Sequence, residues 1–190
     1  MTFENMLSLN EIKLGKILLE NSEPYIVVKT EHHKVARGGA VLKVKLKNLI
    51  NSNVLERTYQ GNDKAVEANT EKKKAQFMYI DGDNANFMDN VSYDQFALPL
   101  EEVGDKQRFL KEGTDVTVLY FEDNPVMIEL PVKMEFKVIS APPGVKGNSA
   151  GNVTKKVKLE TGTEINAPLF INEGDTIRVN TDSGDYVERA

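Results

Sequence analysis

A strict alternation of apolar and basic residues is the feature that most constrains how this chain folds. In the segment "VLKVKLKNL" (residues 41–49), apolar side chains alternate with lysines over six successive positions. The two sets are Leu42, Val44 and Leu46, and then Lys43, Lys45 and Lys47. Because successive side chains of a strand point to opposite faces, this period of two predicts a half-buried β-strand whose outer face carries lysines.

Other segments repeat the β pattern and leave little room for helix. Residues 114–121 are rich in β-branched and aromatic side chains, and a turn at Asp123–Pro125 precedes another apolar run, which predicts a hairpin. Helix is predicted only as one or two turns in residues 92–98 and 99–113, with Gly113 ending the second. The chain is therefore predicted to be all-β, built from small barrels or sandwiches.

Two interruptions divide this pattern into three parts. Residues 60–74 are polar, and Pro131 falls between two strand patterns at a point where the local charge changes sign. Proline is confined to edges, bulges and starts of strands, so a junction at this position is natural. The 190 residues are accordingly interpreted as three β modules, comprising residues 1–67, 68–130 and 131–190.

Charge is distributed in blocks of alternating sign, although the net charge is −5. Residues 31–57 carry six Lys or Arg against two acids, and residues 131–158 carry six lysines against one glutamate. Residues 80–105 carry seven acids without Lys or Arg, and residues 159–190 carry seven acids against two arginines. Separated basic faces on an acidic body favour a polyanion contacted at particular points, with plain solvated surface as the alternative for any single block.

The composition indicates a reducing compartment and no membrane association. Cysteine is absent, which removes disulfides and thiolate chemistry and suits the cytosol. No apolar run approaches the roughly 20 residues that span a bilayer. The first residues also lack a basic segment followed by an apolar one, so we expect no signal peptide and a cytoplasmic location.

Catalytic chemistry finds no support in the motifs. His32 and His33 are adjacent, so in an extended segment they point to opposite faces and cannot easily share one metal. Residues 81–90 carry acids as a calcium loop does, but they lack its sixth-position glycine and closing glutamate, which favours a hairpin turn. No phosphate-binding loop or dinucleotide fingerprint occurs. We therefore predict no catalytic residue, no metal and no cofactor.

The glycine-rich loop "KVARGG" (residues 34–39) precedes the lysine-bearing strand. Gly38 and Gly39 permit backbone angles and close approaches that a Cβ would block. Arg37 beside them presents a planar cation with five hydrogen-bond donors. Such a loop suits the crowded backbone of folded RNA, whereas the alternative is an ordinary hairpin turn with solvated charges.

Four motifs in order resemble the bacterial elongation factor P family along essentially the full length. The loop "KVARGG" with "AVLKVKLKNL" matches a family loop of the type Lys-Pro-Gly-Lys-Gly, or Ser-Gly-Arg-Asn, before a similar strand. The segments "FMYIDGDNANFMD" and "APPGVKGNSAGNVTKKVKLETG" match two further family segments. The last, "APLFINEGDTIRVNTDSGDYVER", is close to the family's C-terminal segment.

The resemblance implies both a fold and a function. It implies an N-terminal KOW/SH3-like domain and two OB-fold barrels, arranged as an L of the size of a tRNA. It implies a translation factor, not an enzyme, that binds the ribosome between the peptidyl-tRNA and exit sites and relieves stalling at consecutive prolines. The expected partners are both ribosomal subunits with their RNA and the P-site peptidyl-tRNA, especially prolyl-tRNA. The factor is expected to act as a monomer.

The resemblance also implies roles for residues of the first module. Arg37 matches the tip residue that reaches the CCA end of the tRNA and is modified in many members, so rhamnosylation by an arginine rhamnosyltransferase is expected, with Lys34 as the lesser candidate. Val35 and Ala36 depart from the usual Pro-Gly or Ser-Gly, and Gly38 stands where asparagine often follows. The expected contacts to tRNA and ribosomal RNA are Lys34, Arg37, Gly38, Gly39, Lys43, Lys45 and Lys47.

In the third module the resemblance implies contacts to the small subunit and the exit site. These residues are Lys146, Gly147, Asn148, Ser149, Gly151, Tyr186 and Arg189. Asn148 replaces a common aspartate, and a core tyrosine with a solvated arginine is the alternative for the last two. An elongation-factor-P-like paralogue with an Ala-Arg-Gly tip and an off-ribosome OB-fold RNA-binding protein remain as alternative identities.

Overall fold

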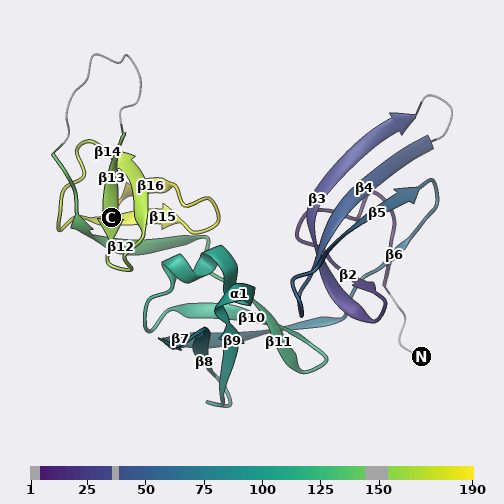
Figure 1. Cartoon of the computed structure of the whole chain (residues 1–190), viewed down its shortest axis with the longest axis horizontal. Coiled ribbons are helices and arrows are strands. Elements are labelled where there is room, and N and C mark those ends of the chain that lie inside the picture. The colour runs from purple at the N-terminus through teal and green to yellow at the C-terminus, as the bar shows by residue number, and fades with distance from the viewer. Residues whose placement is uncertain (1–4, 36–38, 144–153) are drawn as a thin grey trace. The chain divides into compact units, whose positions relative to one another are not determined.

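The structure is a computed structural model and describes residues 5–35, 39–143 and 154–190. Within these ranges the backbone is almost entirely β, which confirms the predicted fold class (Figure 1). The strands are β1 (Met6–Leu7), β2 (Ile17–Glu20), β3 (Glu23–Val35), β4 (Gly39–Asn48), β5 (Val54–Gln60), β6 (Ala65–Val66), β7 (Thr70–Asp81), β8 (Asn84–Asp89), β9 (Gln95–Pro99), β10 (Asp115–Phe121), β11 (Asn124–Glu129), β12 (Lys133–Ser140), β13 (Thr154–Leu159), β14 (Glu164–Pro168), β15 (Thr176–Asn180) and β16 (Tyr186–Arg189). The helices are α1 (Leu100–Val103) and the 3₁₀-helix η1 (Gly104–Phe109).

The chain divides into two compact units. The first unit combines Met1–Lys73 with Val118–Met127, and the second combines Lys74–Thr117 with Ile128–Ala190. In the first unit, four antiparallel strands pair in the order β2-β3-β4-β5, and a small sheet joins β1 to β6. The long strands β3 and β4 form a hairpin that dominates this unit (Figure 1).

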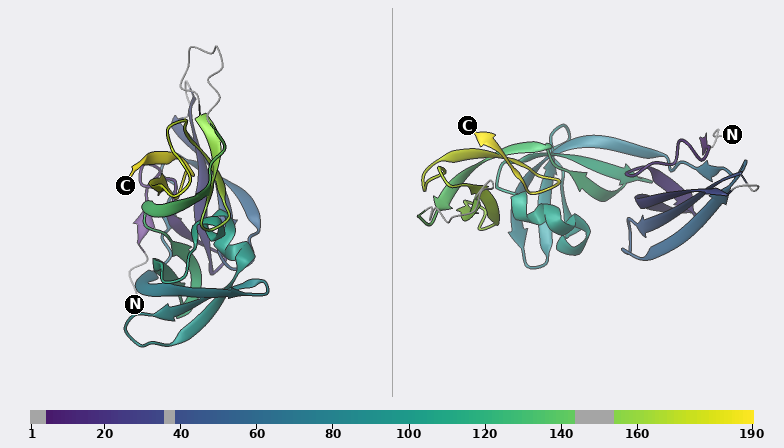
Figure 2. Two further views of the ribbon diagram at one scale, coloured as in Figure 1. Left: turned by 90° about the vertical axis from the view of Figure 1, so that its left-hand side faces the viewer. Right: turned by 90° about the horizontal axis from the view of Figure 1, so that it is seen from above.

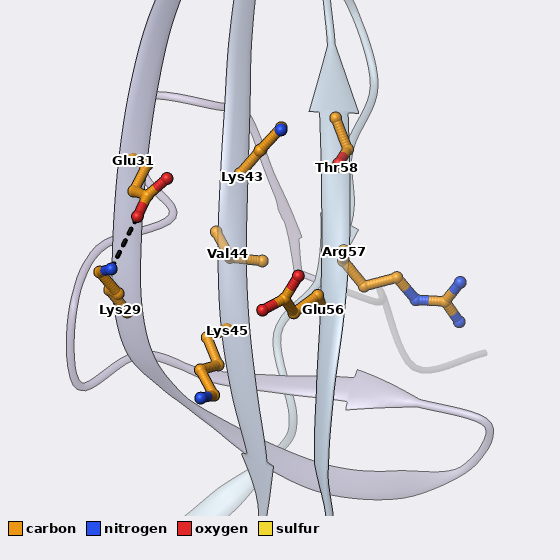
Figure 3. A pocket seen from close by; sticks show the side chains of 8 residues that line it. All are labelled: Lys29, Glu31, Lys43, Val44, Lys45, Glu56, Arg57 and Thr58. Atoms are coloured by element: carbon orange, nitrogen blue, oxygen red, sulfur yellow. Dashed lines mark ion pairs between the residues drawn. The ribbon is translucent and has the colours of Figure 1, made fainter.

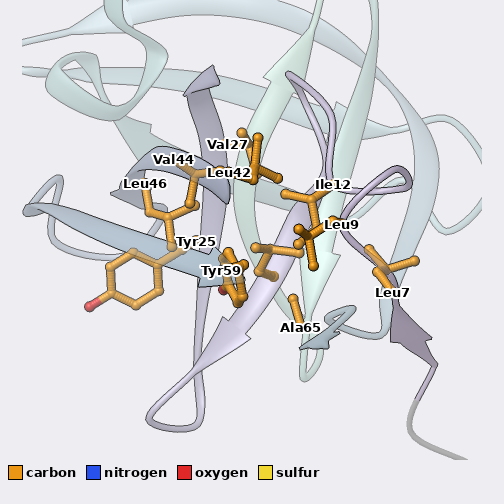
Figure 4. Close-up of a cluster of buried hydrophobic side chains, with 11 residues drawn as sticks. Leu7, Leu9, Ile12, Tyr25, Val27, Leu42, Val44, Leu46, Tyr59 and Ala65 are labelled. Carbon is orange, nitrogen blue, oxygen red and sulfur yellow. The ribbon is translucent and has the colours of Figure 1, made fainter. Parts of the chain in front are cut away.

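The alternation of residues 41–49 has the predicted consequence in β4. Leu42 and Leu46 are completely buried, while Lys43 and Lys45 are exposed. The apolar face of the strand packs into a core of eleven buried residues (Figure 4). These residues are Leu7, Leu9, Ile12, Leu18, Tyr25, Val27, Leu42, Val44, Leu46, Tyr59 and Ala65. Burial of this face removes apolar surface from water, which fixes the register of the sheet and leaves the lysine face outward.

Two further sheets contain five strands each. Their orders are β11-β10-β7-β8-β9 and β14-β13-β12-β15-β16. The strands of both sheets are twisted and curved (Figure 2). In the first of them, Phe87 packs between Phe77 and Phe96, with ring centroids 5.6 Å apart on each side. The pairing of β10 with β11 confirms the hairpin predicted around Asp123–Pro125.

The two predicted helical segments had different outcomes. The prediction of helix in residues 92–98 is wrong, because strand β9 begins at Gln95 and pairs with β8. In residues 99–113 the helical turns are present as α1 and η1, but they end at Phe109 rather than at Gly113. Gly113, with a φ of +80°, instead lies in a turn before β10. Within the described residues neither helix is long and apolar enough to cross a membrane.

The end of η1 contributes a side chain to another core of the second unit. Phe109 is completely buried and belongs to a cluster that is otherwise formed by residues 134–179. Its ring centroid lies 5.8 Å from that of Phe136. Beside it, the Thr163 hydroxyl donates a hydrogen bond of 2.6 Å to the carbonyl of Arg108. The end of η1, at Arg108 and Phe109, is therefore held to the C-terminal sheet by packing and by a hydrogen bond.

Candidate nucleic-acid interface

Three neighbouring strands of the first unit, β3, β4 and β5, present one polar face to solvent. The register of these strands places six residues in two rows across the sheet. The rows are Glu31, Lys43 and Thr58, and then Lys29, Lys45 and Glu56. Figure 3 shows this face from close by, and the hollow over it has a volume of about 230 Å³. We call these six residues the polar face.

One pair of opposite charges on the polar face is already in contact. The ammonium of Lys29 lies 2.7 Å from a carboxylate oxygen of Glu31 (Figure 3). The hydrogen bond and charge of Lys29 lower the pKa of Glu31, and Glu31 raises the pKa of Lys29 in return. Nε2 of His33 lies 3.7 Å from the other carboxylate oxygen of Glu31. Glu31 is thus surrounded by basic groups.

The three lysines of β4 are not equivalent. Lys43 and Lys45 are exposed, and neither forms an ion pair or hydrogen bond within the part of the chain that the structure describes. Lys47 is only partly exposed, because it lies between Ile26 and Val54 of the adjacent strands. Two of the three predicted lysine contacts are therefore exposed to solvent, and the third is partly covered.

Below the polar face, a buried tyrosine joins two strands of the first unit. The hydroxyl of Tyr59 donates a hydrogen bond of 2.9 Å to Glu20, whose other oxygen lies 3.0 Å from the guanidinium of Arg57. Burial, reinforced by the hydrogen bond to Glu20 and by its charge, raises the pKa of Tyr59 well above its ordinary value of 10.0. These contacts tie β5 to β2, the two outer strands of the sheet that carries the polar face.

We expect Tyr59→Phe to lower the free energy of unfolding by about 0.5–1.5 kcal/mol at neutral pH, through loss of one buried hydrogen bond. A raised pKa of Tyr59 in the folded state stabilises the protein below pH 10, and that contribution is lost as pH rises toward the folded-state pKa. The difference between wild type and variant should therefore shrink above pH 10. Urea denaturation at several pH values checks this, with exposed Tyr93→Phe as the control. A constant difference across the series would contradict the assignment.

The structure describes the two strand ends that flank the predicted tip of the β3–β4 hairpin, but not residues 36–38. Val35 and Gly39 are Cα partners, so strand pairing reaches both neighbours of residues 36–38. Arg37 and Gly38 lie outside the described residues. Lys34 is placed by its backbone alone, opposite Ala40. The structure therefore brings Lys34, Gly39 and the β4 lysines onto one hairpin.

The predicted contact residues of the third module fall into two groups. One group lies outside the described residues and comprises Lys146, Gly147, Asn148, Ser149 and Gly151. In the other group, Tyr186 is half-buried and packs against the core of the C-terminal sheet. Arg189 is exposed, with its guanidinium 3.9 Å from a carboxylate oxygen of Asp175. Tyr186 thus has a packing role, and Arg189 has an acidic neighbour.

The alternation of β4 alone does not show that acids share the lysine face. Glu31 and Glu56 are nearest cross-strand neighbours of Lys43 and Lys45 respectively. A hairpin centred on residue 37 would have placed Glu31 opposite Lys43, so a signal for this pair was present in the sequence. Both acids of residues 31–57 therefore lie on the same face as Lys43 and Lys45.

Comparison with known proteins agrees with this architecture. Three family models match consecutive parts of the chain: the elongation factor P KOW-like domain over residues 8–65, the elongation factor P OB domain over residues 70–128, and the elongation factor P C-terminal domain over residues 134–189. Fold and site thus define an all-β translation factor built from KOW-like and OB modules, a class without enzymatic activity.

More specifically, the chain belongs to the elongation factor P family. It is 41% identical to elongation factor P of Endomicrobium trichonymphae and 39% identical to that of Alkaliphilus oremlandii, over 97% of this chain and the whole of each relative. A solved structure of translation initiation factor 5A from Methanococcus jannaschii resembles 68% of this chain and 98% of its own, with a TM-score of 0.50. At 20% identity, that likeness concerns the fold alone.

Proposed function

We propose that this chain is an arginine-tip elongation factor P that binds the ribosome between the peptidyl-tRNA and exit sites. There it positions peptidyl-tRNA and stimulates peptide-bond formation at consecutive prolines. The observation that carries this proposal is the β3–β4 hairpin of a KOW-like domain, whose pairing runs up to both sides of Ala36, Arg37 and Gly38.

The geometry of the β3–β4 hairpin suits a factor that positions peptidyl-tRNA better than one that catalyses the reaction itself. Strand β3 has 13 residues and β4 has 10, so the hairpin extends well beyond its core. A paired hairpin of this length can reach a partner that lies at a distance from the core of the first unit. Proline is a constrained participant in peptide transfer, and holding reactants in the productive geometry can supply a large part of a rate enhancement. The ribosome then performs the reaction itself.

We also propose the RNA contacts of the factor, an enzyme that modifies it and its division into three modules. Lys34, Gly39, Lys43 and Lys45 contact tRNA and ribosomal RNA with Arg37, and Gly38 and the partly covered Lys47 contribute. An arginine rhamnosyltransferase modifies Arg37. Small-subunit and exit-site contacts come from Lys146, Gly147, Asn148, Ser149, Gly151, Tyr186 and Arg189. The factor acts in the cytoplasm as a monomer of three modules (residues 1–67, 68–130 and 131–190).

A second candidate is the elongation-factor-P-like paralogue, which the Ala36-Arg37-Gly38 tip favours. Both candidates are translation factors, and the nascent sequences at which the protein restores synthesis would distinguish them. An off-ribosome OB-fold RNA-binding protein is a further alternative. That role would use exposed aromatic side chains on a barrel face as a platform for bases.

The proposal is tested by translation in vitro with ribosomes free of the endogenous factor. One reporter contains consecutive prolines, and a matched reporter has alanines in their place. Protein purified from its native host should restore synthesis of the proline reporter and leave the alanine reporter unchanged. Equal synthesis with and without the protein would reject the main proposal, and relief of a different stalling motif would favour the paralogue.

Lys43→Ala and Lys45→Ala should each weaken ribosome binding and reduce its dependence on salt. Each phosphate contact contributes about 0.7–0.9 to the slope of log affinity against log salt concentration, so each variant should lower the slope by roughly that amount. Filter binding over a salt series measures this. Lys13→Ala removes an exposed lysine that lies outside β3, β4 and β5 and serves as the control. Slopes equal to that of the control would exclude both lysines from the interface.

A further inference from the structure

Glu31 is one of two acids, with Glu56, on a face that also carries Lys29, Lys43 and Lys45. It lies on β3 directly opposite Lys43, and it contacts Lys29 at 2.7 Å. Its carboxylate is about half exposed, so it also faces whatever ligand lies on the polar face. An acid in this place repels any phosphate that approaches Lys29 or Lys43 closely.

The ion pair between Lys29 and Glu31 also reduces a repulsion between like charges within the sheet. Lys29 and Lys45 are Cα partners across β3 and β4, and like charges directly opposite each other repel. Glu31 lies two residues along the same strand, on the same face as Lys29, and draws its ammonium out of that row (Figure 3). Glu56 lies opposite Lys45 on the other side. Lys43 and Lys45 are left as the two cations of the face without an ion pair among the described residues.

We propose that Glu31 determines the specificity of the polar face by holding Lys29 as an internal ion pair, so that RNA phosphates are bound by Lys43 and Lys45 alone. This inference rests on the proposed function, in which that face contacts RNA. A surface with every lysine free binds polyanions wherever phosphates occur. A surface with acids between its lysines binds only an RNA backbone whose phosphates lie near the lysines and away from the acids. Repulsion by the acids then provides the specificity.

The pair should influence binding more than folding. Lys29 and Glu31 are both largely exposed, with 65% and 46% of their side-chain surfaces accessible. Surface ion pairs of this kind contribute little to stability. A phosphate that binds Lys29 must nevertheless replace Glu31 as its partner and tolerate the nearby carboxylate. A free lysine that binds an RNA phosphate contributes to the release of a counterion. In the wild type, Lys29 is already paired with Glu31 and makes no such contribution.

A double-mutant cycle tests the proposal with wild type, Glu31→Gln, Lys29→Ala and the double variant. Binding to a uridine homopolymer and to ribosomes is measured over a tenfold range of salt. Glu31→Gln should steepen the salt dependence with the single-stranded homopolymer by about 0.7, which corresponds to roughly fivefold in affinity across that range. Lys29→Ala alone should change the slope little, and the double variant should return to the wild-type slope.

Glu173→Gln provides the matched control, because it removes one exposed acid outside β3, β4 and β5. If Glu173→Gln steepens the slope as much as Glu31→Gln does, net charge explains the effect and the proposal fails. A double variant that keeps the steeper slope would also overturn it, since Lys29 would not be the released cation. If Lys43→Ala weakens ribosome binding while Glu31→Gln has no effect, this inference alone falls. If Lys43→Ala has no effect either, the interface itself is wrong.

Discussion

Phe109→Ala is expected to lower the free energy of unfolding of the second unit by about 3–5 kcal/mol, the cost typical of removing a buried aromatic ring. Phe109 is completely buried, and its ring fills a core that β12 to β15 otherwise build. The chain on either side of Phe109 cannot easily move to fill the cavity that the ring would leave, because residues 108 and 111 are themselves held to the C-terminal sheet. Lys111 donates hydrogen bonds to the carbonyl of Glu135 and to the carboxylate of Glu160.

Chemical denaturation followed by circular dichroism measures this effect. Phe170→Ala is the matched control, because it removes the same ring from a site that is 59% exposed. Surface substitutions usually change stability by less than about 0.5 kcal/mol, so the two variants should differ clearly. Equal effects would show that Phe109 adds no more to the core than a surface phenylalanine.

Arg37→Ala is expected to remove most of the stimulation at consecutive prolines. If the tip residue orients the end of the P-site tRNA, its loss permits small displacements of the reacting groups, and displacements of about 1 Å can slow a reaction by about a hundredfold. Synthesis of the proline reporter should therefore fall close to the level without factor. Synthesis of the alanine reporter should not change.

Two comparisons separate the charge of Arg37 from its modification. Arg37→Lys keeps the charge but loses the planar guanidinium, so partial activity would assign the remainder to guanidinium geometry or modification. Native protein and unmodified recombinant protein differ only in what the host adds, and intact-mass measurement detects that difference. Full activity of Arg37→Ala would contradict the role of the tip.

The sequence predicted those parts of the fold that depend on local periodicity. The alternation of β4 had a single solution, because one register buries three aliphatic residues and the other buries three lysines. The local pattern of residues 92–98 is ambiguous, since a short run with Phe96 and Leu98 fits a helical turn and a strand equally. The choice was made by tertiary contacts, in which Phe96 pairs with Phe87 across β8 and β9.

Local periodicity also predicted part of the candidate site. Lys43 and Lys45 follow from the alternation, but the role of Glu31 depends on cross-strand register and on a side-chain contact that no single strand contains. The burial of Phe109 depends on contacts 25 or more residues away along the chain, with Met134 and later residues. Local pattern carries no information at that distance, so this contact could not be foreseen.

The burial of Phe109 has a consequence for how the chain is made. Phe109 is synthesised before every other member of its cluster, and the last member, Val179, follows 70 residues later. At bacterial-type rates of 5–20 residues per second, this interval lasts roughly 4–14 s. During that time the ring has no native core to enter, so residues 104–111 must wait in an incomplete state. A pause in translation between these two positions would lengthen the time for which this ring stays exposed.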